Sequence, residues 1–248
     1  MPFRPLAFIS MLAVMPLADH LALAQQRPSS FINTAAEPAP RDGAARQRFE
    51  LLNQRTRQAA EAGKTNVVFI GDSITEGWEG AGRQAWERHF ASHGALNLGI
   101  SGDRTQHVLW RLNHGNVDGL RPKVVVVMIG TNNSNGDDNT VGEIAAGVRA
   151  VVSRLREKLP EATILLLDVL PRGEQPGAQR GKLCQVNQVI ARLHDAKQVV
   201  FLPIGHHFLA DDGVIDRRIM PDYLHLSPEG YETWAAAIEP ELSRLLGS

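Results

Sequence analysis

Short apolar runs alternate with longer helix-like segments through most of this chain, and this alternation constrains the fold more than any other feature. The clearest run, Val124 to Ile129, is apolar without interruption, which is typical of a strand covered on both faces. Strands that alternate with helices predict a parallel sheet with helices on both sides. We therefore expect an α/β protein with three layers, α/β/α, around a five-stranded parallel sheet. Its strands should be residues 67–70, 95–98, 124–129, 164–170 and 199–204.

The helical segments carry their own boundary signals. Apolar residues recur at helical spacing from Thr140 to Leu159, and Pro160 should end that helix. Near the end of the chain, Ser227 is a natural N-cap and Pro228 a natural first helical residue. These signals predict a final helix that begins directly after a loop containing His225.

The first 24 residues differ from the rest of the chain. A short start with Arg4 precedes the apolar run from Leu6 to Ala18, and Ala22-Leu23-Ala24 follows. This is the layout of a secretory signal peptide with an Ala-x-Ala cleavage site. The apolar run is too short to span a bilayer. We expect residues 1–24 to be a signal peptide, the protein to be periplasmic or secreted, and no membrane anchor.

The segment after the proposed cleavage point has no periodicity. Residues 25–43 are rich in Pro, Ala, Ser and Gln, a composition that predicts a flexible linker. The remaining residues, 44–248, have the length of one folded domain.

Charge and cysteine content exclude several classes of protein. The formal net charge of -1 results from 26 basic and 27 acidic residues, without the basic footprint of a nucleic-acid-binding protein. Cys184 is the single cysteine, so no intramolecular disulfide forms. No Cys/His spacing indicates a metal site, and we expect no metal and no cofactor.

Polar residues follow the predicted strands where a site would lie. Gly71-Asp72-Ser73 comes directly after the first strand, Gly99 follows the second and Asn132 the third. Parallel sheets hold their ligands at the carboxyl ends of their strands. Ser73 alone could be a helix cap, and His225 alone a surface residue. With Asp222 three positions earlier to fix its ring, His225 becomes a candidate base for Ser73.

These residues resemble the four sequence blocks of the SGNH hydrolase (GDSL esterase/lipase) superfamily. The blocks are carried by Ser73, Gly99, Asn132 and His225, in the order of that family. Within it, the chain looks most like the catalytic subunits of brain-type platelet-activating-factor acetylhydrolase. That likeness is carried by residues 96–100, 107–112, 130–133 and 170–174. The resemblance implies a flavodoxin-like SGNH hydrolase fold and a serine esterase.

The resemblance also implies roles for individual residues. Ser73 would be the nucleophile, His225 the base and Asp222 the group that orients the base. The backbone N–H groups of Ser73 and Gly99 and the side-chain amide of Asn132 would form the oxyanion hole. Chain order alone would also fit an α/β-hydrolase, but no Gly-x-Ser-x-Gly elbow surrounds Ser73.

Three neighbours of these residues are expected to limit the acyl group. Ile74, Thr131 and Leu224 each adjoin a predicted site residue, and in the similar acetylhydrolases bulky residues at these positions narrow the acyl pocket. We therefore expect short-chain, acetyl ester substrates. The alcohol half stays open between an acetylated carbohydrate and a phospholipid, and a homodimer is one assembly that we consider.

Two other functions remain as alternatives. A lipase or lysophospholipase would cleave longer acyl chains with the same residues. A flavodoxin-like binding protein without activity would explain Ser73 and Gly99 but leave Asp222 and His225 without a role, and residues 71–75 do not form a phosphate-binding loop.

Overall fold

The computed structural model describes residues 33–247, so the predicted signal peptide and residues 25–32 of the predicted linker lie outside the described part. Five strands form one sheet in the order β2-β1-β3-β4-β5, and every pairing is parallel. The strands are β1 (Val67–Gly71), β2 (Ala95–Asn97), β3 (Val124–Met128), β4 (Thr163–Leu167) and β5 (Val199–Leu202). The predicted five-stranded parallel sheet is confirmed, with some strands one to three residues shorter than expected.

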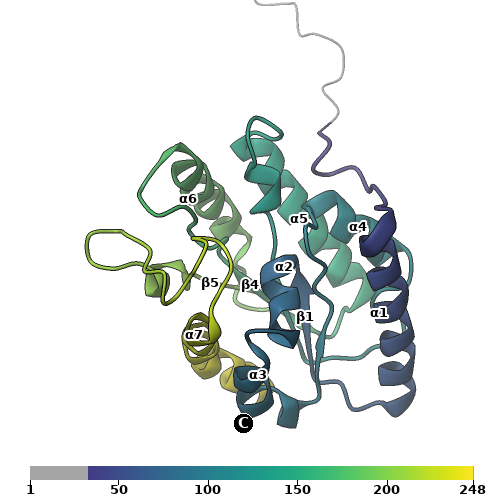
Figure 1. Cartoon of the computed structure of the whole chain (residues 1–248). Helices are drawn as coiled ribbons and strands as arrows, with labels where there is room; N and C mark the ends of the chain where they lie inside the picture. The colour runs from purple at the N-terminus through teal and green to yellow at the C-terminus, as the bar shows by residue number, and fades with distance from the viewer. Residues whose placement is uncertain (1–32, 248) are drawn as a thin grey trace, which may run out of the picture. The chain divides into compact units, whose positions relative to one another are not determined.

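Helices cover both faces of the sheet (Figure 1). One face carries α1 (Gly43–Ala62), α4 (Thr105–Asn113), α5 (Val141–Lys158) and α6 (Ala178–Ile190). The other carries α3 (Arg83–His89) and α7 (Pro228–Leu246). Short helical turns complete the list: α2 (Ser73–Glu76), η3 (Gly77–Glu79), η4 (Ala91–His93), η5 (Asn132–Ser134), η6 (Ala191–Leu193) and η7 (Gly205–Phe208).

Side chains that alternate along each strand enter two separate apolar cores. In β1, Val68 and Ile70 face the core under α1, α4, α5 and α6. Val67 and Phe69 face the core under α3 and α7, which is rich in aromatic side chains. Both cores exclude water almost completely, which explains the uninterrupted apolar runs. None of the helices between residues 33 and 247 is long and apolar enough to cross a membrane.

The last helix begins as its sequence predicts. Ser227 accepts a hydrogen bond from the Gly230 N–H at 3.1 Å, and Pro228 is the first helical residue. Tyr231 and Trp234 then point into the aromatic core, where each is at most 2% exposed. This packing fixes the direction in which the preceding loop, with His225, approaches the sheet.

Residues 33–42, which we name the N-terminal arm, differ from the predicted flexible linker. The Ala35 side chain is fully buried. Its carbonyl accepts a hydrogen bond from Thr105 Oγ1 at 2.7 Å, and the Ala39 N–H donates to the Gln106 carbonyl at 3.1 Å. Composition misses this docking because it depends on backbone hydrogen bonds and one small side chain, not on a long apolar stripe.

Candidate active site

Ser73 lies at the sharp turn that follows β1, which pairs with β2 on one side and β3 on the other. Gly71 ends the strand, and a Cβ there would lie 2.1 Å from Thr75 Oγ1 and 2.5 Å from the Met128 carbonyl oxygen. Only glycine fits so close a turn. Asp72 then caps α2, since its Oδ1 accepts from the Ile74 N–H at 3.0 Å. As the first helical residue, Ser73 has a backbone N–H with no acceptor inside the helix.

The loop before α7 brings His225 to this turn from the far end of the chain. His225 Nε2 lies 2.9 Å from Ser73 Oγ, and His225 Nδ1 lies 2.7 Å from Asp222 Oδ2. The other carboxylate oxygen of Asp222 accepts from the backbone N–H groups of Leu224 and His225. A carboxylate at Nδ1 favours the tautomer with the proton there, which leaves Nε2 free to accept from the Ser73 hydroxyl.

Electrostatics keep the Asp222 carboxylate charged. Partial burial opposes its ionisation, but the hydrogen bonds from the His225 ring and backbone outweigh this and lower the pKa of Asp222 below its usual range. The pair is nevertheless open to solvent, with the side chains of His225 and Asp222 47% and 56% exposed. The imidazole can therefore be reached from the solvent.

Asn132 begins η5, in the turn that follows β3. Its side-chain Nδ2 donates to the Asp103 carbonyl at 2.9 Å, which uses one of its two amide hydrogens. Its neighbour Asn133 is fully buried and accepts from the Thr105 N–H at 3.0 Å. The two asparagines thus point to different surroundings.

The structure departs from the expectation at Gly99. Its backbone N–H donates to Asn97 Oδ1 at 2.9 Å, and a Cβ on Gly99 would lie 2.2 Å from the Glu76 backbone nitrogen. This glycine is needed for close backbone packing, and its N–H is already engaged. The sequence could not reveal this, because the competing acceptor is the side chain of a residue in β2.

Gly102 is better placed to supply a backbone donor. It has a left-handed conformation, with φ of 77°, in a turn closed by the Asp103 N–H and the Ile100 carbonyl. In the part of the chain that the structure describes, the Gly102 N–H donates to no protein acceptor. Its neighbour Asp103 contacts the Asn132 amide, so Gly102 lies beside Asn132.

The three residues expected to limit the acyl group have different surroundings. Ile74 is 2% exposed and Thr131 is 3% exposed, while Leu224 is half-buried. Ile74 and Leu224 pack into the same apolar core. The Thr131 hydroxyl accepts from Arg172 Nη1 at 3.3 Å.

Two charged residues near the site were not singled out from the sequence. Burial raises the pKa of Asp72 to about 7. Burial lowers the pKa of the Arg172 guanidinium, although the nearby carboxylates of Asp72 and Asp222 oppose that change. Arg172 stands in one of the segments that carry the family resemblance, and this is the only sequence signal that could have pointed to it.

The sequence is similar to those of known proteins. Residues 69–233 match the GDSL-like Lipase/Acylhydrolase family. This chain belongs to that family. The human platelet-activating factor acetylhydrolase IB subunit alpha1 is 38% identical over 216 residues, which cover 86% of this chain and 91% of the relative. The mouse alpha2 subunit is 38% identical over 182 residues, or 73% of this chain and 77% of the relative. The protein is therefore a carboxylic ester hydrolase.

Solved structures confirm the fold of this GDSL-like acylhydrolase. A GDSL-like lipase from Bacteroides thetaiotaomicron superposes with a TM-score of 0.63 at 22% identity, over 79% of this chain and 98% of its own. The acetylxylan esterase Axe2 from Geobacillus stearothermophilus gives a TM-score of 0.57 at 19% identity, over 75% of this chain and 97% of its own. At such identities the likeness concerns the fold alone.

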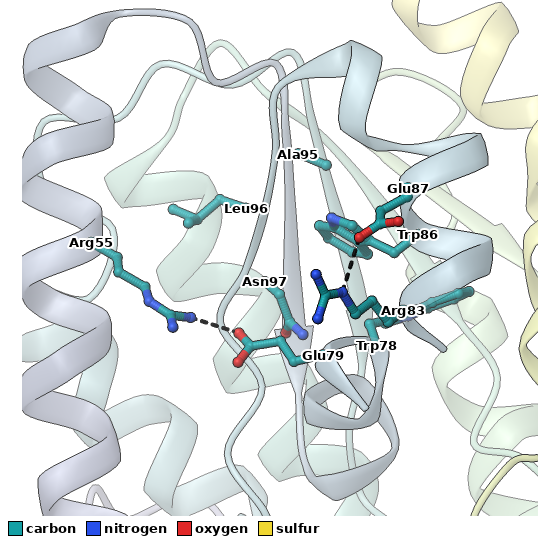
Figure 2. A pocket seen from close by; sticks show the side chains of 9 residues that line it. All are labelled: Arg55, Trp78, Glu79, Arg83, Trp86, Glu87, Ala95, Leu96 and Asn97. Atoms are coloured by element: carbon teal, nitrogen blue, oxygen red, sulfur yellow. Dashed lines mark hydrogen bonds and ion pairs between the residues drawn. The ribbon is translucent and has the colours of Figure 1, made fainter. Parts of the chain in front are cut away.

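This acylhydrolase also has a cavity of about 380 Å³ beside the edge strand β2, and Ser73 is not among the residues that line it (Figure 2). Ion pairs between Arg55 and Glu79 and between Arg83 and Glu87 stand at its rim. Its lining residues are Arg55, Trp78, Glu79, Arg83, Trp86, Glu87, Ala95, Leu96 and Asn97. Among residues 33–247, no group of three His, Cys, Asp or Glu side chains is arranged to hold a metal ion.

Proposed function

We propose that this acylhydrolase is a serine esterase that removes short acyl groups, above all acetyl, from its substrate. The observation that carries the proposal is the line of hydrogen bonds from Ser73 Oγ through the His225 ring to Asp222, with spacings of 2.9 and 2.7 Å. A serine hydroxyl is a weak nucleophile unless a base takes its proton, and the base must be held in one tautomer. His225 and Asp222 meet both needs.

In the first half of the reaction, Ser73 Oγ attacks the ester carbonyl carbon while His225 Nε2 takes the hydroxyl proton. The carbonyl oxygen becomes an oxyanion. Asp222 stabilises the imidazolium that forms. His225 then gives the proton to the leaving alcohol, and the acyl group stays on Ser73. In the second half, His225 activates water in the same way, and the carboxylic acid is released.

The oxyanion is stabilised by donors from three turns at one sheet edge. The Ser73 N–H is free because it begins α2, and the second amide hydrogen of Asn132 remains after its bond to Asp103. We assign the third donor to the Gly102 N–H, since the Gly99 N–H is taken by Asn97. Each donor of this kind contributes roughly 10²–10³ to turnover.

Packing around Ser73 favours a small acyl group. Ile74 is buried beside the nucleophile, and Leu224 packs into the same apolar core. An added methylene without room costs about 1–3 kcal/mol. The alcohol half meets a more open surface, because His225 and Asp222 are about half exposed. A bulky alcohol such as an acetylated carbohydrate suits this surface, and an acetylated phospholipid is the competing substrate.

The test of the mechanism is Ser73→Ala, His225→Ala and the double variant, assayed with p-nitrophenyl acetate. Each single variant should lose most of the turnover, and the double variant should lose little more, because residues that act as a unit are not additive. Circular dichroism should show folded proteins throughout. A double variant whose loss equals the product of the two single losses would show that the two residues act independently.

The acyl preference is tested with p-nitrophenyl esters of increasing chain length. The kcat/KM for the acetyl ester should exceed that for the butyryl ester. The factor should be roughly tenfold or more for each methylene group that does not fit into the acyl pocket. Leu224→Ala should relax this preference. Equal cleavage of the octanoyl and acetyl esters by the unmodified protein would favour a lipase. Acetylated sugars assayed against acetylated phospholipids would identify the alcohol half.

A further inference from the structure

We propose that the N-terminal arm, residues 33–42, holds the oxyanion turn in its working geometry, with Arg41 as a positioning residue. The inference rests on the proposed function, because it concerns the Ser101–Asp103 turn that we assign to the oxyanion hole. The arm lies outside the sequence motifs of the family, because it precedes residues 69–233, which match the family.

Arg41 contacts the turn on both sides of Gly102. Its Nη1 donates to the Ser101 carbonyl at 2.5 Å and to Asp103 Oδ1 at 3.2 Å. A Cβ added to Gly102 would lie 3.0 Å from Arg41 Nη2. The guanidinium therefore spans the peptide groups that determine the direction of the Gly102 N–H.

Asp103 connects this guanidinium to the second oxyanion donor. The Asp103 side chain is 2% exposed and also accepts from Arg111 Nε at 2.8 Å. Its backbone carbonyl accepts from Asn132 Nδ2 at 2.9 Å. Movement of Asp103 would thus displace the Asn132 amide together with the turn.

The rest of the arm is anchored next to the same turn. Thr105 Oγ1 donates to the Ala35 carbonyl at 2.7 Å, and Asn139 Nδ2 donates to Thr34 Oγ1 at 3.1 Å. A Cβ on Gly147 of α5 would lie 2.6 Å from the Ala35 carbonyl oxygen, so the arm packs closely against the backbone of this helix. Arg41 is consequently held in place at the end of a docked segment.

The turn is held mainly by groups outside its own backbone. A single backbone hydrogen bond, from the Asp103 N–H to the Ile100 carbonyl, closes it, the Ser101 N–H donates to Glu76 Oε2 at 2.5 Å, and Ser101 is exposed. Oxyanion donors act only when they are fixed before charge develops, and a misplacement of about 1 Å can cost up to about 10² in rate. Loss of Arg41 should therefore impair the transition state more than substrate binding.

The first measurement compares Arg41→Met and Arg41→Lys in the full chain with p-nitrophenyl acetate. Arg41→Met should lower kcat by about tenfold with KM within about twofold, which is the pattern of an interaction made in the transition state. Arg41→Lys keeps the charge but reaches fewer acceptors, so it should recover part of the loss. Arg83→Met is the matched control, because Arg83 is 74% exposed and pairs with Glu87 on α3; its kcat should stay unchanged.

A second measurement separates positioning from general stability. If Arg41 acts on the oxyanion hole, the loss caused by Arg41→Met should shrink when Asn132 is already alanine. The affinity for a trifluoromethyl ketone, whose adduct carries an oxyanion, should fall in parallel with kcat/KM. The proposal would be overturned if Arg41→Met had the same kcat as the control Arg83→Met. It would also be overturned if Arg41→Met changed only KM, by raising it. If Arg41→Met does not fold, the test uses Arg41→Lys instead. The proposal would then be overturned if Arg41→Lys had the wild-type kcat and if the effects of Arg41→Lys and Asn132→Ala on kcat were fully additive. Full activity of Ser73→Ala would instead refute the proposed function.

Discussion

At the scale of single residues, adjacent side chains have distinct tasks. Asn132 donates one amide hydrogen to the Asp103 carbonyl, and we propose that the other binds the oxyanion. Asn133 is buried and donates to Gln106 Oε1 and Asn139 Oδ1, both at 3.0 Å. One asparagine is thus open to chemistry, and the other connects loops.

Asn132→Ala should lower kcat by about 10²-fold with a small change in KM, because its amide acts mainly on the transition state. Asn133→Ala should lower kcat less and reduce the free energy of unfolding instead, since it removes partners from buried polar groups. Steady-state kinetics and urea unfolding of both variants check this contrast. A change confined to KM in Asn132→Ala would assign Asn132 to substrate binding.

Asp72 gives a prediction about pH and stability. Burial raises its pKa from 3.8 to about 7, so between these values the folded protein binds more protons at this site than the unfolded chain. The contribution of Asp72 to stability is therefore lost as pH rises, by up to about 1.4 kcal/mol per pH unit. Asp72→Asn keeps an acceptor for the Ile74 N–H and should remove this loss. Urea midpoints measured from about pH 5 to about pH 8 should fall more steeply for the wild type; parallel curves would contradict the assignment.

At the scale of elements, α7 supports from the aromatic core the turn that carries Ser73, the proposed nucleophile. The Tyr231 hydroxyl donates to the Ile74 carbonyl at 2.7 Å, and burial raises the pKa of Tyr231 above its usual range. The phenol is therefore a neutral donor. The loop with Asp222 and His225 directly precedes the same helix, so α7 links the proposed base, His225, to the turn that carries Ser73.

Tyr231→Phe should lower the free energy of unfolding by about 1–2 kcal/mol, because it leaves the buried Ile74 carbonyl without this donor. Thr233→Val is the control on the same helix: it removes an exposed hydroxyl that bonds to the Glu229 carbonyl, and it should change stability by at most about 0.5 kcal/mol. Thermal unfolding of the two variants measures the difference. Equal stabilities would show that the Tyr231 bond contributes nothing.

At the scale of the whole molecule, we propose that residues 1–24 direct export and are removed after Ala24. The mature chain should then begin at Gln25, only a few residues before the docked arm. Intact-mass measurement of the protein from the periplasm or medium of its host tests this, with Ala24→Phe as a variant that should block cleavage. An unprocessed chain found inside the cell would contradict it.

The sequence by itself determined the layers and the position of the candidate site. Uninterrupted apolar runs such as residues 124–129 leave no choice but a strand covered on both faces, because burial of those side chains dominates the local free energy. Ser227 and Pro228 determine where α7 begins through their own backbone chemistry. Ser73, Asn132 and His225 were therefore expected at one sheet edge, and the structure brings Ser73 and His225 within hydrogen-bonding distance.

Only the tertiary structure decided which backbone donors are free and which segments are docked. The sequence pointed to Gly99 as the backbone donor, but the Asn97 side chain engages the Gly99 N–H, whereas the Gly102 N–H has no acceptor within residues 33–247. The N-terminal arm has the composition of a linker, yet Thr105 and Gln106 fix its backbone. Both outcomes depend on the hydrogen-bond partners that the fold provides. The partners of the arm are distant in sequence, and the partner of the Gly99 N–H is presented by a particular turn. No local pattern of polarity encodes such partners.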